Sequence, residues 1–165
     1  MFLHAYQSYV FNIILSRRIL KFSIHEAVVG DIMCFKNEMG LPDTSRLQSV
    51  TKDNLDGINN LINRGRAFVT APLVGYDTRF AQGEPGEVEK AVIGDLNINL
   101  EGFKVPAMPE LASKGLRREI IMPFKPEYSA SEDELNVGKT KLTFEFTLQK
   151  GGYATTVLRE YMKKL

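Results

Sequence analysis

Three cations stand close together in one short run of the chain, at Lys114, Arg117 and Arg118 within the segment 113–119. Lys and Arg side chains near the start of a strand can hold phosphate oxygens through charge-assisted hydrogen bonds. The same cations could alternatively form a solvated surface that binds nothing. The same two alternatives apply to two smaller basic groups. One consists of Arg17, Arg18 and Lys21, and the other of Arg64 and Arg66.

An aromatic ring follows a pair of glycines near the end of the chain, where Tyr153 comes after Gly151 and Gly152. Glycines let the backbone pass close to a neighbour or a ligand, and the face of a ring can stack on any nucleobase. Tyr153 could therefore bind a base, or it could equally be a buried anchor of the helix it begins. Arg159, in the same helix, could face a carboxylate elsewhere or lie in solvent.

Asp77 and Arg79 lie in a segment rich in glycine and polar residues, 76–86. Long loops often carry function, so these residues could face a substrate. They could also form an ion pair on an ordinary surface loop. The acidic residues that follow, Glu87 and Glu89, are expected on the solvated face of a helix.

Several kinds of chemistry have no support in these residues. The single cysteine, Cys34, excludes a disulfide within the chain, and the two histidines are not spaced as zinc ligands. The sequence has no dinucleotide-binding glycine fingerprint, no phosphate-binding loop and no serine nucleophile elbow. We therefore expect neither a metal nor a cofactor, and the residue pattern by itself does not identify an enzyme.

The composition describes a folded chain without a strong charge. The 165 residues carry a formal net charge of +1, far from the basic excess of a dedicated nucleic-acid binder, so any RNA contact must use local patches. No apolar run reaches the roughly 20 residues that a membrane span needs. The single cysteine fits a reducing compartment, and we expect a cytoplasmic protein.

Helices and strands are expected in a mixed order. Apolar residues at helical spacing predict a helix over 2–18, and alternation of apolar and polar residues predicts a half-buried strand over 139–149. The other expected elements are helices over 52–63, with Thr51 as N-cap, over 84–95 and over 153–164, a short helix over 109–112, and strands over 32–36, 66–73 and 116–124. Pro72 predicts that its strand lies at a sheet edge or ends there.

The order of elements predicts an α+β fold of small mixed sheets with flanking helices. The segments 37–49 and 127–138 are polar and are expected as loops, and the second is the best internal boundary. The long last strand has no evident partner in the earlier sequence, so we expect its sheet to involve residues outside this chain. The sequence thus has the features of a fragment.

Five segments, in this order along the chain, resemble the tRNA pseudouridine synthase D (TruD) family in its archaeal form. They are Ala5-Tyr6-Gln7-Ser8-Tyr9-Val10-Phe11-Asn12, Thr70-Ala71-Pro72-Leu73-Val74-Gly75-Tyr76, Gly83-Glu84-Pro85-Gly86-Glu87-Val88-Glu89, Ser113-Lys114-Gly115-Leu116-Arg117-Arg118-Glu119 and Tyr153-Ala154-Thr155-Thr156-Val157-Leu158-Arg159-Glu160. Each motif alone is weak, but five in the family's order make a specific pattern. The resemblance covers nearly the whole chain and is to the C-terminal portion of such an enzyme.

The resemblance implies a cofactor-free isomerase that converts uridine to pseudouridine in tRNA. It implies an insertion domain over 1–136 and the last strand and helix of the catalytic domain over 137–165. The family's catalytic aspartate lies in a Gly-Lys-Asp-Lys-like run that this sequence lacks, so we expect that residue in a missing N-terminal part and expect the chain alone to be inactive. Tyr153 and Arg159 would line the active site. The residues Lys114, Arg117, Arg118, Asp77 and Arg79 would either contact RNA or take part in domain packing. The alternative is a non-catalytic RNA-binding module.

Overall fold

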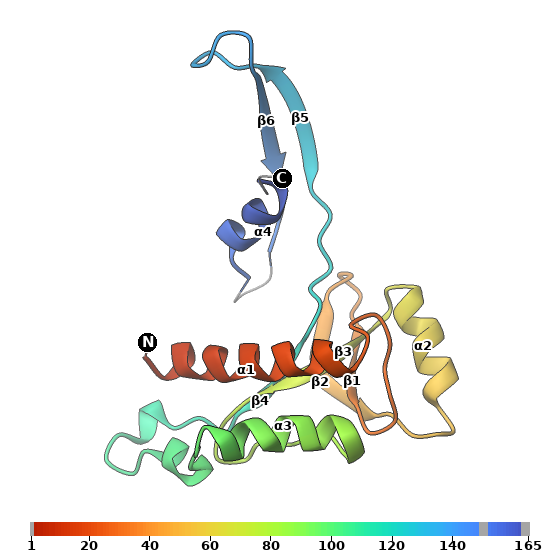
Figure 1. Cartoon of the computed structure of the whole chain (residues 1–165), viewed down its shortest axis with the longest axis vertical. Helices are drawn as coiled ribbons and strands as arrows, with labels where there is room; N and C mark the ends of the chain where they lie inside the picture. Colours follow the sequence, from red (N-terminus) through yellow and green to blue (C-terminus); the bar gives the residue numbers. More distant parts are fainter. Residues whose placement is uncertain (1, 149–151, 163–165) are drawn as a thin grey trace. The chain divides into compact units, whose positions relative to one another are not determined.

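The computed structural model describes residues 2–148 and 152–162, which form two compact units that divide after Met122 (Figure 1). Its helices and strands confirm the α+β class, with small antiparallel sheets and flanking helices. The division after Met122 is a geometric one. The sequence-based division at 136 and 137 concerns insertion and catalytic domains, and it stays a prediction.

The first unit is built on a four-stranded antiparallel sheet of order β2-β1-β3-β4. Helices α1 and α3 pack on each other, and α1 also packs on β3 (Figure 1). The elements of this unit are α1 (Phe2–Lys21), β1 (Ile32–Lys36), β2 (Pro42–Ser49), α2 (Leu55–Asn63), β3 (Ala67–Leu73), α3 (Gly83–Asp95), the 3₁₀ helices η1 (Leu100–Lys104) and η2 (Pro109–Leu111), and β4 (Leu116–Glu119).

Two apolar clusters form the core of this unit. In the first, Val10 and Ile14 of α1 pack with Val92 of α3 and Phe103 of η1 beside the end of β3. In the second, α2 packs on β1 and the start of β3. Helix α1 was predicted correctly from the spacing of its apolar residues, but two of those residues, Phe2 and Tyr9, are exposed. The buried face consists of Gln7, Val10, Phe11, Ile14 and Arg18.

Strand β3 lies inside the sheet, between β1 and β4. The sheet-edge alternative for Pro72 is therefore wrong, and the strand-end alternative is confirmed. Pairing of β3 with β1 covers Ala67 to Val69 only, and Pro72 pairs only with β4, opposite Arg117. A proline without an N–H group is tolerated there because one side of the strand has already lost its partner.

The second unit consists of a β-hairpin and a helix. Strands β5 (Glu127–Glu132) and β6 (Thr140–Glu145) are antiparallel, and α4 (Ala154–Tyr161) follows them. Aromatic rings connect the three elements, since the ring centroid of Phe144 in β6 lies 6.4 Å from that of Tyr128 in β5 and 4.8 Å from that of Tyr161 in α4. The expected loop over 127–138 is wrong in its first half, because β5 supplies the partner for β6.

Other expected boundaries differ by local structure. The polar loop expected over 37–49 contains β2, and helix α2 begins at Leu55 with Asn54, not Thr51, as its N-cap. The Asn54 side chain instead accepts a hydrogen bond from the N–H of Thr51 (2.8 Å). Gly151 and the expected ends of the last strand at 149 and of the last helix at 163–164 lie outside the described residues.

A candidate nucleic-acid interface

Two segments that the sequence singled out separately lie against each other in the first unit. We call residues 75–82 the Asp77 loop and residues 113–115 the Lys114 turn. The N–H of Tyr76 donates to the carbonyl oxygen of Ser113 (3.0 Å), and the N–H of Asp77 donates to that of Lys114 (2.9 Å). Asp77, Arg79 and Lys114 are all exposed. The fold thus brings three of the predicted RNA contacts to two adjoining backbone segments.

Glycines make this close approach possible. A Cβ atom on Gly75 would lie 2.1 Å from the backbone nitrogen of Gly115, and Gly115 itself has a φ of +84°. Neither separation nor dihedral suits a residue with a side chain. Thr78 closes the loop from its other side, because its hydroxyl accepts from the N–H of Gly75 (2.7 Å) and donates to the Gly75 carbonyl oxygen (2.6 Å).

Gln7 joins helix α1 to the Lys114 turn and to Val74, which immediately precedes the Asp77 loop. Its buried amide donates to the carbonyl oxygen of Val74 (2.6 Å) and to the hydroxyl of Ser113 (2.8 Å). In the sequence, Gln7 is noticeable only as part of the segment 5–12. A polar residue on the same helical face as Val10 and Ile14 was the available signal, since buried amides need partners.

Arg117 is not a surface cation, and its expected contact with RNA is corrected by its burial. Its side chain is 2% exposed and pairs with Glu89, 6% exposed, at 2.6 Å. All five of its N–H donors are used: Nε donates to the Thr70 hydroxyl, Nη2 to the Thr70 carbonyl oxygen and to Glu89, and Nη1 to Glu89 and the Arg79 carbonyl oxygen. Glu89 is likewise buried, so its expected place on a solvated face is wrong.

Arg118, the next residue of β4, is half-buried, and its guanidinium carbon lies 5.6 Å from the centroid of the Phe11 ring. The second basic group, Arg17, Arg18 and Lys21, does not form one surface patch either. Arg18 is buried and forms two hydrogen bonds with the Asp31 carboxylate, at 2.7 and 2.8 Å, while Arg17 reaches Asp95 near the surface. Of the cations in the segment 113–119, only Lys114 is fully on the surface.

Tyr153 is the N-cap residue of α4 and has extended backbone, with φ of −110°. Its carbonyl oxygen accepts from the N–H of Thr156 (3.0 Å), and the residue is 68% exposed. The alternative of a buried anchor therefore does not describe this ring. Arg159 is exposed on the same helix.

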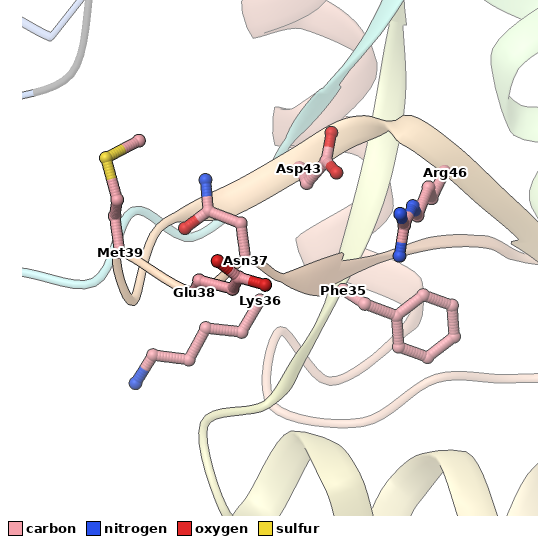
Figure 2. Close-up of a pocket in the computed structure, with 7 residues that line it drawn as sticks. All are labelled: Phe35, Lys36, Asn37, Glu38, Met39, Asp43 and Arg46. Carbon is pink, nitrogen blue, oxygen red and sulfur yellow. The ribbon is translucent and has the colours of Figure 1, made fainter.

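A separate pocket of about 480 Å³ lies at the tip of the β1–β2 hairpin (Figure 2). Its lining includes two cations, Lys36 and Arg46, and two acids, Glu38 and Asp43, so the lining residues carry no formal net charge. Hydrogen bonds from the Ser45 hydroxyl and N–H hold the pKa of Asp43 below its usual value. None of the residues predicted to act on RNA lines this pocket, which Phe35, Asn37 and Met39 complete.

The described part of the chain offers neither a cluster of metal ligands nor a membrane-spanning helix. No three or more of its His, Cys, Asp and Glu side chains gather as a metal site would require. Among the helices of residues 2–148 and 152–162, none combines the length and the apolar character needed to cross a bilayer.

Comparison with known protein families identifies the family of this chain. The model of the family described as tRNA pseudouridine synthase D (TruD) matches residues 1–161. The chain belongs to this family, and the resemblance read from its motifs is confirmed.

Named relatives are archaeal proteins. The chain is 62% identical over 164 residues to the probable tRNA pseudouridine synthase D of Methanococcoides burtonii and 56% identical to that of Methanosarcina mazei, and in each case 99% of this chain is aligned. The crystal structure of the Methanosarcina mazei TruD protein is similar with a TM-score of 0.82 at 55% identity, over 96% of this chain. The chain spans 37% of the length of these relatives.

Proposed function

We propose that this chain is part of a tRNA pseudouridine synthase, which isomerises uridine to pseudouridine in tRNA. The observation that carries the proposal is the family match over residues 1–161. Such an enzyme would act in the cytoplasm, where its tRNA substrate is found, and would need no cofactor or metal.

The reaction breaks a glycosidic bond and rebuilds it to carbon, which requires a positioned carboxylate as nucleophile or base. This sequence contains no Gly-Lys-Asp-Lys-like run. We propose that the carboxylate comes from the part of the relatives' length that this chain does not span. The division of labour would follow the sequence-based domains, with residues 1–136 as the insertion domain and 137–165 returning to the catalytic domain.

Within that enzyme, Tyr153 would hold the target base after it leaves its stack, because a ring face can support a flipped base. Its exposed ring supports this role. Arg159 would line the same site. Asp77, Arg79 and Lys114 would contact tRNA, and their neighbouring backbone segments support a shared surface.

The rival proposal is a non-catalytic RNA-binding module. It rests on the same cations, and burial of Arg117 with partial burial of Arg118 removes much of its support. A salt-dependent affinity for tRNA without any pseudouridine formation in a complete enzyme would favour it.

A chimaera provides the test. This chain replaces its matched portion of the Methanosarcina mazei protein. Tritium release from 5-tritiated uridine, or chromatographic separation of the nucleosides, then measures pseudouridine in a tRNA transcript. We expect turnover by the chimaera and none by the chain alone. Tyr153→Ala should abolish turnover, while Tyr153→Phe, which keeps the ring, should retain it. A folded but inactive chimaera would contradict the proposal, and turnover by the chain alone would contradict the missing carboxylate.

A further inference from the structure

The buried ion pair of Arg117 and Glu89 reaches the backbone of the Asp77 loop at two points. Arg117 Nη1 donates to the carbonyl oxygen of Arg79 (2.8 Å), and Glu89 Oε2 accepts from the N–H of Ala81 (2.7 Å). One partner comes from β4 and the other from α3. The pair therefore joins a sheet strand and a helix to both peptide groups that flank Phe80.

Burying this ion pair contributes little net stability to the fold. Taking two charges out of water costs several kcal/mol per ion, and apolar residues of similar volume are often as good or better. The geometry here goes beyond charge neutralisation, because the planar guanidinium uses all five donors in fixed directions. Two of its five hydrogen bonds hold Thr70 on β3, and one holds the loop.

The end of the loop is fitted closely to its neighbours as well. Gly30 accepts from the N–H of Gln82 (2.9 Å), and a Cβ atom on Gly30 would lie 2.0 Å from the Gln82 carbonyl oxygen. A Cβ atom on Gly86 would lie 2.1 Å from the carbonyl oxygen of Ala81. These close backbone contacts restrict the conformation that residues 79–82 can adopt.

We infer that Arg117 and Glu89 are positioning residues, which fix the Asp77 loop so that the exposed Arg79 side chain meets a phosphate of the RNA substrate. The inference rests on the proposed function for its ligand. Arg79 is held through its own carbonyl oxygen, while its guanidinium lies at the surface near the Ser49 hydroxyl (3.2 Å). A fixed backbone lowers the entropy lost when such a side chain binds.

Arg117→Lys isolates positioning from charge. Lysine keeps the positive charge but has three donors on one nitrogen, so it cannot reach Arg79, Thr70 and Glu89 together. Hydrogen exchange in the full chain should show a slow Ala81 N–H in the wild type and exchange at least about tenfold faster in the variant. Affinity for an unmodified tRNA transcript at low salt should fall about tenfold, the equivalent of one charge-assisted contact. In the chimaera, KM should rise while kcat is unchanged.

Arg17→Lys is the matched control, because Arg17 forms its surface ion pair with Asp95, at the opposite end of α3 from the Asp77 loop. It should change neither Ala81 exchange nor tRNA affinity. A folded Arg117→Lys chain with wild-type affinity would overturn the inference. If that variant does not fold, rapid Ala81 exchange in the wild type would overturn it and slow exchange would support it. A wild-type chain that binds no tRNA would overturn the proposed ligand, and Ala81 exchange would still decide whether the pair fixes the loop.

Discussion

Gly75→Ala should separate the Asp77 loop from the Lys114 turn. A Cβ atom at position 75 would lie 2.1 Å from the nitrogen of Gly115, 2.4 Å from the carbonyl carbon of Lys114 and 2.4 Å from the carbonyl oxygen of Ser113. All three atoms belong to the backbone, so no side-chain rotation can relieve the overlap. The turn must move as a unit.

The size of the effect follows from two contributions. Overpacking costs about 1–3 kcal/mol. Moving the turn also removes two backbone hydrogen bonds, from Tyr76 to Ser113 and from Asp77 to Lys114, at about 0.5–1.5 kcal/mol each. We expect the free energy of unfolding to fall by about 4 kcal/mol, a large part of the stability of a domain of this size.

Urea unfolding followed by far-UV circular dichroism measures the change by linear extrapolation. Gly94→Ala is the matched control, since Gly94 lies in α3 with nothing within 4 Å of its Cβ position. The same chemical change should there raise stability, by up to about 1 kcal/mol. Equal unfolding midpoints for wild type and Gly75→Ala would refute the reasoning, because they would mean that the two segments are not in contact.

Three further results are expected from buried and exposed groups. Asp31→Ala should lower the free energy of unfolding by about 3–5 kcal/mol in the same assay, because it leaves the Arg18 guanidinium buried without its carboxylate. Burial raises the pKa of the Cys34 thiol from 9.0 to about 12, so a thiol reagent should modify only the unfolded chain at neutral pH. Since the folded pKa is the higher one, this thiol's contribution to stability is complete below pH 9.0 and is lost as the pH rises towards 12. Log affinity for tRNA falls with log salt concentration, and replacing Arg79 and Lys114 by alanine should make this slope less steep by about 1–2, measured by filter binding.

The controls for these results use groups of the same kind in other surroundings. Asp95→Ala breaks the surface pair with Arg17 and should cost at most about 1 kcal/mol; a cost equal to that of Asp31→Ala would contradict the argument from burial. A native chain that reacts with the thiol reagent as fast as the unfolded chain would contradict the burial of Cys34. Replacing Arg64 and Arg66 removes two surface cations elsewhere, and an equal loss of tRNA affinity would mean that the loop and turn are not special.

The sequence predicted apolar elements well and polar strands badly. Strand β1 was predicted at its observed bounds, Ile32–Lys36, because its first three side chains, Ile32, Met33 and Cys34, are buried and apolar. Strand β2 is a sheet edge, and all six residues of β5 are exposed. Such strands exist because their backbone groups pair with β1 and β6, and their side chains carry no alternation that a sequence could display.

The segments of the candidate site were predictable, and their contact was not. The glycine-rich loop and the basic turn each carried a local signal. Their adjacency depends on the pairing of β3 with β4, which sets Leu73 opposite Leu116. Long-range pairing of this kind is a tertiary property, so a single sequence could suggest two candidate segments without indicating one surface.

The error at Arg117 was avoidable. Consecutive residues of a strand point to opposite faces of the sheet, and Arg117 and Arg118 both lie in the strand expected over 116–124. They could not share one solvated surface, so one guanidinium had to find partners within the fold. What the sequence lacked was the identity of the acid: Glu89 lies 28 positions away on α3, among exposed acids such as Glu84 and Glu87. Cations in a strand should therefore be assigned to the two faces of the sheet before a binding patch is inferred. A cation on the buried face should be examined for the backbone groups and side chains that it holds in place.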